Sequence, residues 1–153
     1  MSDINIILYN PASKSSKLGG VELLDEWDVL DGAWVWVNIS GESDEVERKL
    51  LGERFGVPHL AIQDANRERH PPKLEVFDSL VFIMLRDLLA EDEPHEHRVS
   101  QISLFLGANF LVSRHDSKFP SLKAIFDAVE LQPESLSKGP AHITYLISRR
   151  IVD

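Results

Sequence analysis

The sequence predicts one domain of the α/β class in which helices and strands follow in mixed order (α+β) instead of a regular βαβ repeat. Short segments rich in β-branched and aromatic residues lie beside segments whose apolar residues recur at helical spacing. The chain has 153 residues, 43% of them hydrophobic and 27% charged, which suits a soluble globular domain with a core of its own.

The first forty residues read mainly as strands. The predicted elements are a strand over residues 4–9, a polar loop over 11–20, a short strand over 21–24 and a strand over 33–39. Trp34 and Trp36 stand two residues apart in the last of these strands, so both point to one face. We expect them to form part of the core, in preference to stacking on a ligand.

Two consecutive helices are predicted in the next part of the chain. The first runs from about Ser43 to Phe55, since N-capping residues precede an apolar stripe made by Val46, Leu50, Leu51 and Phe55. Gly56 closes this helix. Pro58 opens the second helix at a first-turn position that tolerates proline.

The remaining residues predict a group of strands followed by two helices. The expected elements are one or two strands within 73–89, a hairpin of strands 99–106 and 110–113, a helix from Pro120 and a last helix carrying Ile143 to Ile151. The last helix has no capping residue, and its stripe of isoleucine and leucine predicts a continuation or a partner. We therefore expect the chain to be part of a longer protein.

Charge and composition exclude several classes of function. The net charge is −9, from 25 acidic and 16 basic residues, and a surface of this sign repels nucleic acid. The absence of cysteine excludes disulfides and thiolate sites. There is neither a signal peptide nor a run of about 20 apolar residues, so we expect a soluble, cytoplasmic chain.

The histidines are the first candidates for metal or catalytic chemistry. His95 and His97 stand among acidic residues in an expected turn that could hold a divalent ion loosely, although a solvated loop is the favoured interpretation. His115 and Asp116 follow a strand, but no nucleophile or second carboxylate forms a recognisable constellation with them. His142 is expected to pack or to face solvent. No catalytic motif is present, so the sequence predicts no enzyme.

Local spacing gives Asp64 a structural role. His59 and Asp64 are five residues apart, so a helix rotates them away from each other and they cannot bind one ion together. His59 instead pairs with Gln63 at i+4, and Asp64 pairs with Arg67 at i+3.

Two neighbouring segments, FGVPHLAIQDA (residues 55–65) and HPPKLEVF (residues 70–77), resemble the CorA family of divalent-cation transporters. That family shows F-G-[LI]-H-P-L-x-[LI]-E-D, followed by a nine-residue step from the aspartate to the lysine of R-P-K-V-E. The step from Asp64 to Lys73 has the same length.

Further segments of the chain resemble the same family in the same order. They are VWVNISG (35–41), LVFIMLR (80–86), VSQISLFLGANFL (99–111) and YLISRRIVD (145–153). The chain departs from the family pattern at a few positions. Gln63 replaces a glutamate, Pro71 replaces an arginine, His59 follows a proline instead of preceding one, and Arg149 or a neighbour replaces an aspartate of the stalk helix.

The resemblance implies an α/β/α sandwich with a mixed central sheet, ending in the start of a long stalk helix. Residues 1–140 would form the N-terminal cytoplasmic domain, and residues 141–153 would begin the stalk. The transmembrane helices and the pore would follow beyond residue 153. The full protein would be a pentamer whose cytoplasmic funnel senses ions and gates the pore for Mg²⁺ or Co²⁺.

The resemblance also implies a second role for Asp64, which would help to hold a regulatory divalent cation at a subunit interface. Its partner carboxylate would come from the stalk helix of a neighbouring subunit. Because Gln63 is uncharged where the family has glutamate, we expect this site to be weakened.

Three alternatives remain open. One is a zinc transporter of the ZntB branch, which shares the domain. The second is a stand-alone soluble binding or scaffold module. The third is a metal-dependent hydrolase using His59, Asp64 and the His115-Asp116 pair, which no motif supports.

Overall fold

A computed structural model describes residues 2–67, 71–89, 98–115 and 120–152. Its strands are β1 (Ser2–Asn10), β2 (Ser15–Gly19), β3 (Trp34–Gly41), β4 (Lys73–Val76), β5 (Val81–Leu89), β6 (Arg98–Leu106) and β7 (Phe110–His115). Its helices are α1 (Leu23–Val29), α2 (Glu45–Lys49), the π-helix η1 (Leu50–Arg54), α3 (His59–Ala65), α4 (Pro120–Leu131), the 3-10 helix η2 (Pro133–Lys138) and α5 (Pro140–Val152).

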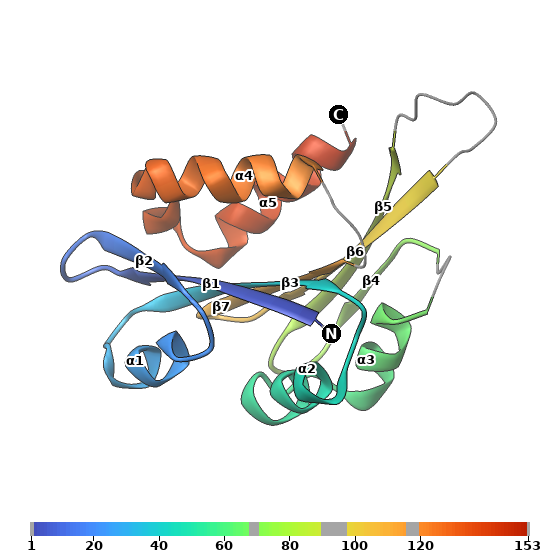
Figure 1. The fold of residues 1–153 in the computed structure, drawn as a ribbon, viewed down its shortest axis with the longest axis horizontal. Helices are drawn as coiled ribbons and strands as arrows, with labels where there is room; N and C mark the ends of the chain where they lie inside the picture. Colours follow the sequence, from blue (N-terminus) through green and yellow to red (C-terminus); the bar gives the residue numbers. More distant parts are fainter. Residues whose placement is uncertain (1, 68–70, 90–97, 116–119, 153) are drawn as a thin grey trace.

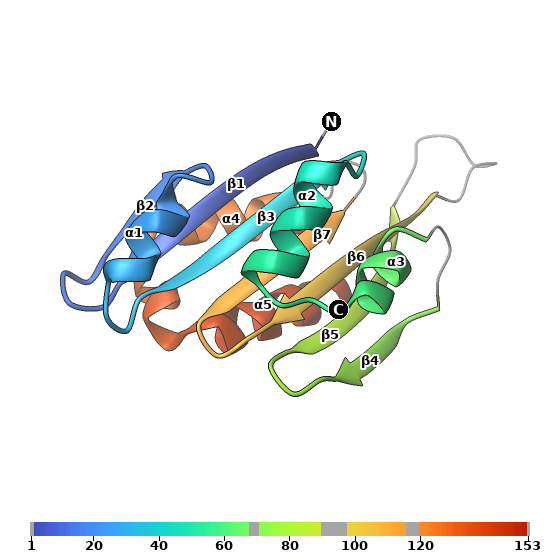
Figure 2. The same cartoon turned by 90° about the horizontal axis from the view of Figure 1, so that it is seen from below.

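The seven strands form one mixed sheet in the order β2-β1-β3-β7-β6-β5-β4. β3 and β7 pair in parallel at its centre, and the other neighbouring strands pair antiparallel. Helices α1, α2 and α3 cover one face, and α4 and α5 cover the other (Figures 1 and 2). The predicted fold class, an α/β/α sandwich with a mixed central sheet, is confirmed.

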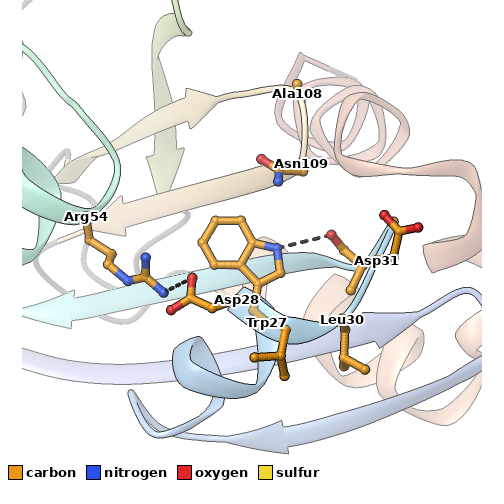
Figure 3. A pocket seen from close by; sticks show the side chains of 10 residues that line it. Trp27, Asp28, Leu30, Asp31, Arg54, Ala108 and Asn109 are labelled. Atoms are coloured by element: carbon orange, nitrogen blue, oxygen red, sulfur yellow. Dashed lines mark hydrogen bonds and ion pairs between the residues drawn. The ribbon is translucent and has the colours of Figure 1, made fainter.

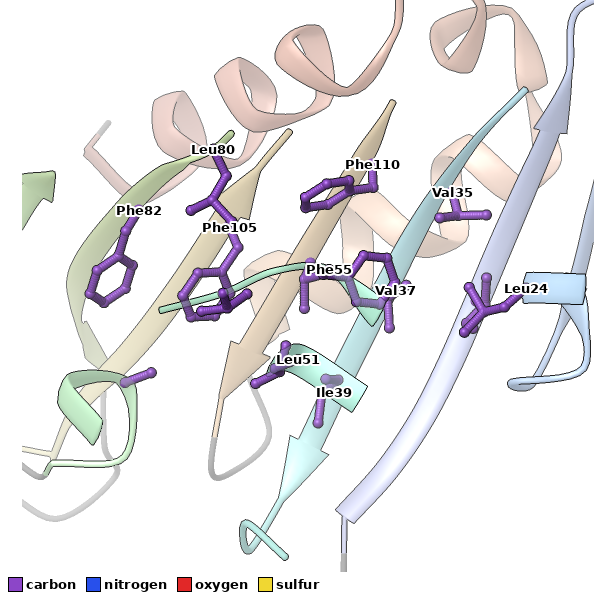
Figure 4. Close-up of a cluster of buried hydrophobic side chains, with 14 of the residues drawn as sticks. Leu24, Val35, Val37, Ile39, Leu51, Phe55, Leu80, Phe82, Phe105 and Phe110 are labelled. Atoms are coloured by element: carbon purple, nitrogen blue, oxygen red, sulfur yellow. The ribbon is translucent and has the colours of Figure 1, made fainter. Parts of the chain in front are cut away.

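The first core cluster lies between the sheet and the layer of α1, α2 and α3 (Figure 4). Its aromatic rings make close pairs: Phe82 stacks on Phe105 with ring centroids 5.0 Å apart, and Phe55 lies 5.0 Å from Phe110. Each large side chain buried in this way contributes about 1.5–3 kcal/mol to folding. The helix layer is therefore held firmly on this face.

The second core cluster lies between the sheet and α4, η2 and α5. Trp34 and Trp36 both belong to it, which confirms their predicted core role. The indole Nε1 of Trp34 donates a hydrogen bond to the carbonyl oxygen of Leu136 at 2.8 Å, and that of Trp36 donates to Ser113 Oγ at 2.9 Å. Burial of both rings thus leaves neither N–H unsatisfied.

The apolar stripe of the last helix packs on the sheet of its own chain. Ile143 and Ile147 of α5 are buried in the second cluster, and Leu146 and Ile151 pack partly buried against it. The stripe was expected to need a continuation or a partner, and the structure shows that its own sheet covers the two central residues.

Most predicted elements are present, but two near the N-terminus are wrong. Residues 15–19 form β2, an edge strand paired with β1, where a loop was expected. An edge strand with one solvated side needs little apolar alternation, so its polar sequence resembles a loop. Residues 21–24 do not form a strand, because Leu23 and Leu24 open α1 and bury their side chains against the sheet.

The predicted helix over residues 43–55 is present as α2 and η1, and Leu50, Leu51 and Phe55 of its apolar stripe pack in the first core cluster, whereas Val46 does not. Val46 is 69% exposed, whereas Glu47 is fully buried. The buried face runs through Glu47, Leu51 and Phe55, each four residues from the next, which suits a helix that widens into a π-turn. Gly56 closes the segment with φ +66°, as predicted.

The described helices were also compared with the requirements of a membrane span. Among residues 2–67, 71–89, 98–115 and 120–152, no helix combines the length and the apolar character needed to cross a bilayer.

Candidate functional site

Asp64 lies on the last turn of α3, a short helix that begins after Pro58. Pro58 is extended (φ −60°, ψ 144°), and its carbonyl oxygen accepts the backbone N–H groups of Ala61 and Ile62. Ala61, Ile62 and Ala65 face the first core cluster. This packing fixes α3 on the sheet and leaves the Asp64 side chain, 20% exposed, at the edge of the buried region.

Asp64 pairs with Lys73, the first residue of β4. The Nζ atom of Lys73 lies 2.7 Å from Asp64 Oδ2 and 3.5 Å from Glu75 Oε2. It also lies 5.6 Å from the centroid of the Phe82 ring. The nine-residue step seen in the sequence therefore brings the end of α3 and the start of β4 into one ion pair.

Asp64 also pairs with its predicted partner Arg67, and this ion pair is longer and more exposed than the pair with Lys73. The Arg67 Nη1 atom is 3.9 Å from Asp64 Oδ1, and its side chain is 70% exposed, whereas that of Lys73 is 26% exposed. The hydrogen bond to Asp64 raises the pKa of the Lys73 ammonium, so this group stays charged at neutral pH. The predicted ion pair between Asp64 and Arg67 is therefore confirmed, and the shorter pair with Lys73 was not predicted.

This geometry limits how Asp64 could bind a metal ion. A divalent cation that takes Asp64 Oδ2 must compete with an ammonium group already at hydrogen-bond distance. Within the part of the chain that the structure describes, no group of three or more His, Asp or Glu side chains could hold a metal ion. Further carboxylates would therefore have to come from outside these residues.

The other predicted site residues do not gather around Asp64. His59 Nε2 lies 3.1 Å from Gln63 Nε2, which confirms the predicted pair, and both side chains are exposed on α3. His115 is buried at the end of β7, and His142 of α5 is partly exposed with its ring 6.3 Å from that of Tyr145. His95, His97 and Asp116 lie outside the described residues.

A buried ion pair at the end of the parallel strands was not foreseen from the sequence. Arg114 Nε of β7 lies 2.8 Å from Glu47 Oε2 of α2, and the two side chains are 1% and 0% exposed. Arg114 Nη2 also donates to the carbonyl oxygen of Gly41 at 2.6 Å. The pair ties α2 and the end of β3 to β7. The available signal was an arginine that directly follows a predicted strand with an apolar start.

Comparisons with known proteins agree on one family. A family model described as "CorA-like Mg2+ transporter protein" matches residues 31–153. YfjQ of Bacillus subtilis (strain 168), provisionally named a metal ion transporter, is 30% identical over 150 residues, which are 98% of this chain and 44% of that protein. The cobalt/magnesium transport protein CorA of Thermotoga maritima is 37% identical over 76 residues, 48% of this chain and 21% of that protein.

Solved structures share the fold at low sequence identity. The soluble domain of CorA from Methanocaldococcus jannaschii has a TM-score of 0.70 at 15% identity and covers 95% of this chain and 55% of its own. The ZntB cytoplasmic domain of Vibrio parahaemolyticus has a TM-score of 0.65 at 15% identity, with 97% and 57% covered. The chain spans less than half the length of the curated relatives it matches.

Proposed function

This chain belongs to the CorA-like Mg²⁺ transporter family, and on that premise we propose that it is the soluble, cytoplasmic, regulatory part of a membrane protein that transports divalent cations. The observation that carries the proposal is the family match over residues 31–153, on a fold shared with the soluble domain of an archaeal CorA. The full protein would assemble as a homo-pentamer and contribute this domain to the funnel beneath the pore.

The proposed cargo is Mg²⁺ or Co²⁺. The relative named for cobalt and magnesium transport is 37% identical over 76 residues, whereas the ZntB domain is 15% identical and therefore supports the fold alone. Zinc transport is the second candidate, which the sequence resemblance left open and which the shared fold does not distinguish from the first. The relatives described above are named as transporters, so we propose no enzymatic reaction.

The proposed regulatory ligand is a divalent cation held by Asp64 in the assembled protein. Asp64 is partly exposed at the end of α3, and a carboxylate is the ligand that Mg²⁺ prefers. The Asp64 carboxylate is already paired with Lys73 and Arg67, so it cannot hold Mg²⁺ alone. A second carboxylate from a neighbouring subunit would supply the missing charge, and Gln63 would keep the affinity low.

Lys73 gives this site an internal competitor. Its ammonium already occupies Asp64 Oδ2, so binding of a divalent ion there requires the Lys73 ammonium to move away. Lys73 begins β4, and Asp64 lies on the last turn of α3. Replacement of the Lys73 ammonium by a divalent ion would therefore change the contact between α3 and β4. We propose that this change is transmitted to the subunit interface.

Uptake in cells tests the proposed function. The full-length protein is expressed in a bacterial strain that lacks its own magnesium uptake systems, and growth is measured at limiting Mg²⁺ together with sensitivity to added Co²⁺. We expect restored growth and increased cobalt sensitivity. Zinc accumulation without either effect would favour the ZntB-like alternative, and no change in any ion would contradict transport and favour a stand-alone module.

A further inference from the structure

A pocket of about 680 Å³ lies at the opposite end of the helix layer from Asp64. Figure 2 shows α1 and α3 at the two ends of this layer. The pocket is formed by the end of α1, the loop that leads into β3, the last residue of η1 and the turn between β6 and β7. We call it the Trp27 pocket, after the residues Trp27, Asp28, Leu30, Asp31, Arg54 and Asn109 that line it (Figure 3).

Trp27 forms a wall of the pocket that is fixed before any ligand arrives. Its ring stacks on Phe55 with centroids 5.9 Å apart, and its Nε1 donates to the carbonyl oxygen of Ala33 at 3.1 Å. The Arg54 guanidinium lies 5.4 Å from the ring centroid. A wall held in this way loses little conformational entropy on binding, which favours affinity.

The charges that line the pocket favour a cationic ligand. Arg54 donates to Asp28 Oδ1 at 2.6 Å and to the carbonyl oxygen of Leu24 at 2.9 Å, so its charge is offset within the protein. Asp28 and Asp31 together carry two negative charges against the one positive charge of Arg54, which leaves a net charge of −1 in the lining. An anionic ligand would meet this net negative charge.

The Trp27 pocket also has an apolar lining and a rim that is exposed to solvent. Val29, Leu30 and Ala108 line the pocket beside Trp27, and Val29 is 80% exposed at the rim. The Asp31 side chain is also exposed at the rim. A volume of this size lies within the range of ligand sites, about 300–1,000 Å³.

We propose that the Trp27 pocket binds an aliphatic amine, an organic cation whose ammonium groups are joined by a short apolar stem. The stem packs against Trp27, Leu30 and Ala108. One ammonium group pairs with Asp31, and a second shares Asp28 with Arg54. This site is independent of the divalent-cation function, because none of its residues belongs to the Asp64 region.

Fluorescence titration with three matched probes tests the proposal. Putrescine, 1,4-butanediol and adipate share a stem of four methylene groups and carry two positive charges, no charge and two negative charges. Trp34 and Trp36 are buried, so a change of emission on binding reports Trp27. We expect saturable binding of putrescine that weakens with added salt, and weaker or no binding of the other two probes. Equal binding of butanediol, or tighter binding of adipate, would overturn the proposal.

Two variants with the same net charge distinguish binding in the Trp27 pocket from non-specific attraction to the acidic surface of the protein. Asp31→Asn removes a carboxylate at the rim, and Asp25→Asn removes one from the exposed side of α1, outside the lining. We expect Asp31→Asn to weaken putrescine binding about three- to fivefold and Asp25→Asn to leave it nearly unchanged. Equal effects of the two variants would show attraction to the acidic surface alone and would refute the site.

Discussion

Replacement of Arg114 by methionine is expected to cost a large part of the stability of the domain. Arg114 and Glu47 are 1% and 0% exposed and lie 2.8 Å apart, so the substitution leaves a carboxylate buried without its guanidinium. Removal of one partner from a buried ion pair costs about 3–5 kcal/mol. Methionine carries no charge and replaces only the aliphatic stem of arginine, so the substitution also removes the hydrogen bond from Arg114 Nη2 to the carbonyl oxygen of Gly41.

The stability lost in Arg114→Met should depend on pH, because the buried Glu47 carboxylate becomes neutral when it takes up a proton. Burial raises the pKa of the Glu47 carboxyl above its usual value of 4.5, and the Arg114 guanidinium opposes that rise. Without Arg114 the pKa in the folded state rises further. When the pKa of a carboxyl is higher in the folded state than in the unfolded state, protonation stabilises the fold at pH values below the unfolded-state pKa. This stabilisation is lost as pH rises through the folded-state pKa. The cost of Arg114→Met should therefore be largest at pH 7 and should shrink toward pH 4.5.

Urea unfolding followed by tryptophan emission measures this prediction at pH 7 and pH 5. The Glu47→Met/Arg114→Met double variant is the matched control, because it removes both charges and should lose less stability at pH 7 than Arg114→Met alone. The reasoning is refuted if Arg114→Met costs less than about 1 kcal/mol, if its cost does not shrink with pH, or if the double variant is as unstable as the single one.

Three further outcomes are expected. If Mg²⁺ inhibits the proposed transport through Asp64, Lys73→Met in the full-length protein should lower the Mg²⁺ concentration that inhibits flux by up to about fivefold; an unchanged or raised concentration would contradict competition at Asp64. Hydrogen bonds from the backbone N–H groups of Ser2 and Glu47 lower the pKa of the Asp44 carboxyl below its usual 3.8. The ionised carboxylate therefore stabilises the fold above pH 3.8, and this stabilisation is lost as pH falls through the pKa of Asp44 in the folded state. The stability advantage of wild type over Asp44→Asn should therefore disappear in acid unfolding curves, and a constant difference would argue against it. Gly56→Ala forces a side chain to φ +66° and should cost about 1–2 kcal/mol in urea unfolding, while Gly52→Ala, whose added carbon would lie 4.0 Å from Ile62, should cost nothing.

Strands and helices with strong periodicity could be predicted from the sequence. Trp34 and Trp36 identified β3 because two aromatic residues at i and i+2 share one face of a strand. The helix predicted from Pro120 is present as α4, in which Leu122, Ile125, Phe126 and Val129 recur at helical spacing and are all buried. Both signals are local, so they did not depend on knowledge of the tertiary structure.

The elements that sequence reasoning missed depend on contacts between distant residues. β2 is polar and becomes a strand only because β1 pairs with it. Glu47 is buried because Arg114, 67 residues further along the chain, supplies the opposite charge. Similarly, the i+3 rule paired Asp64 with Arg67, whereas the fold brings Lys73 to 2.7 Å. Local spacing carries no information about such partners.

The most direct test of the central claim is ion flux through the full-length protein in liposomes. Mg²⁺ and Co²⁺ influx is recorded while the Mg²⁺ concentration is varied on the side that carries this domain, for wild type and Asp64→Asn. The account predicts influx of both ions that wild type shuts off at high Mg²⁺, and a loss of this shut-off in Asp64→Asn. Absence of influx in wild type would contradict the transport function, and identical shut-off in both proteins would contradict the regulatory role of Asp64.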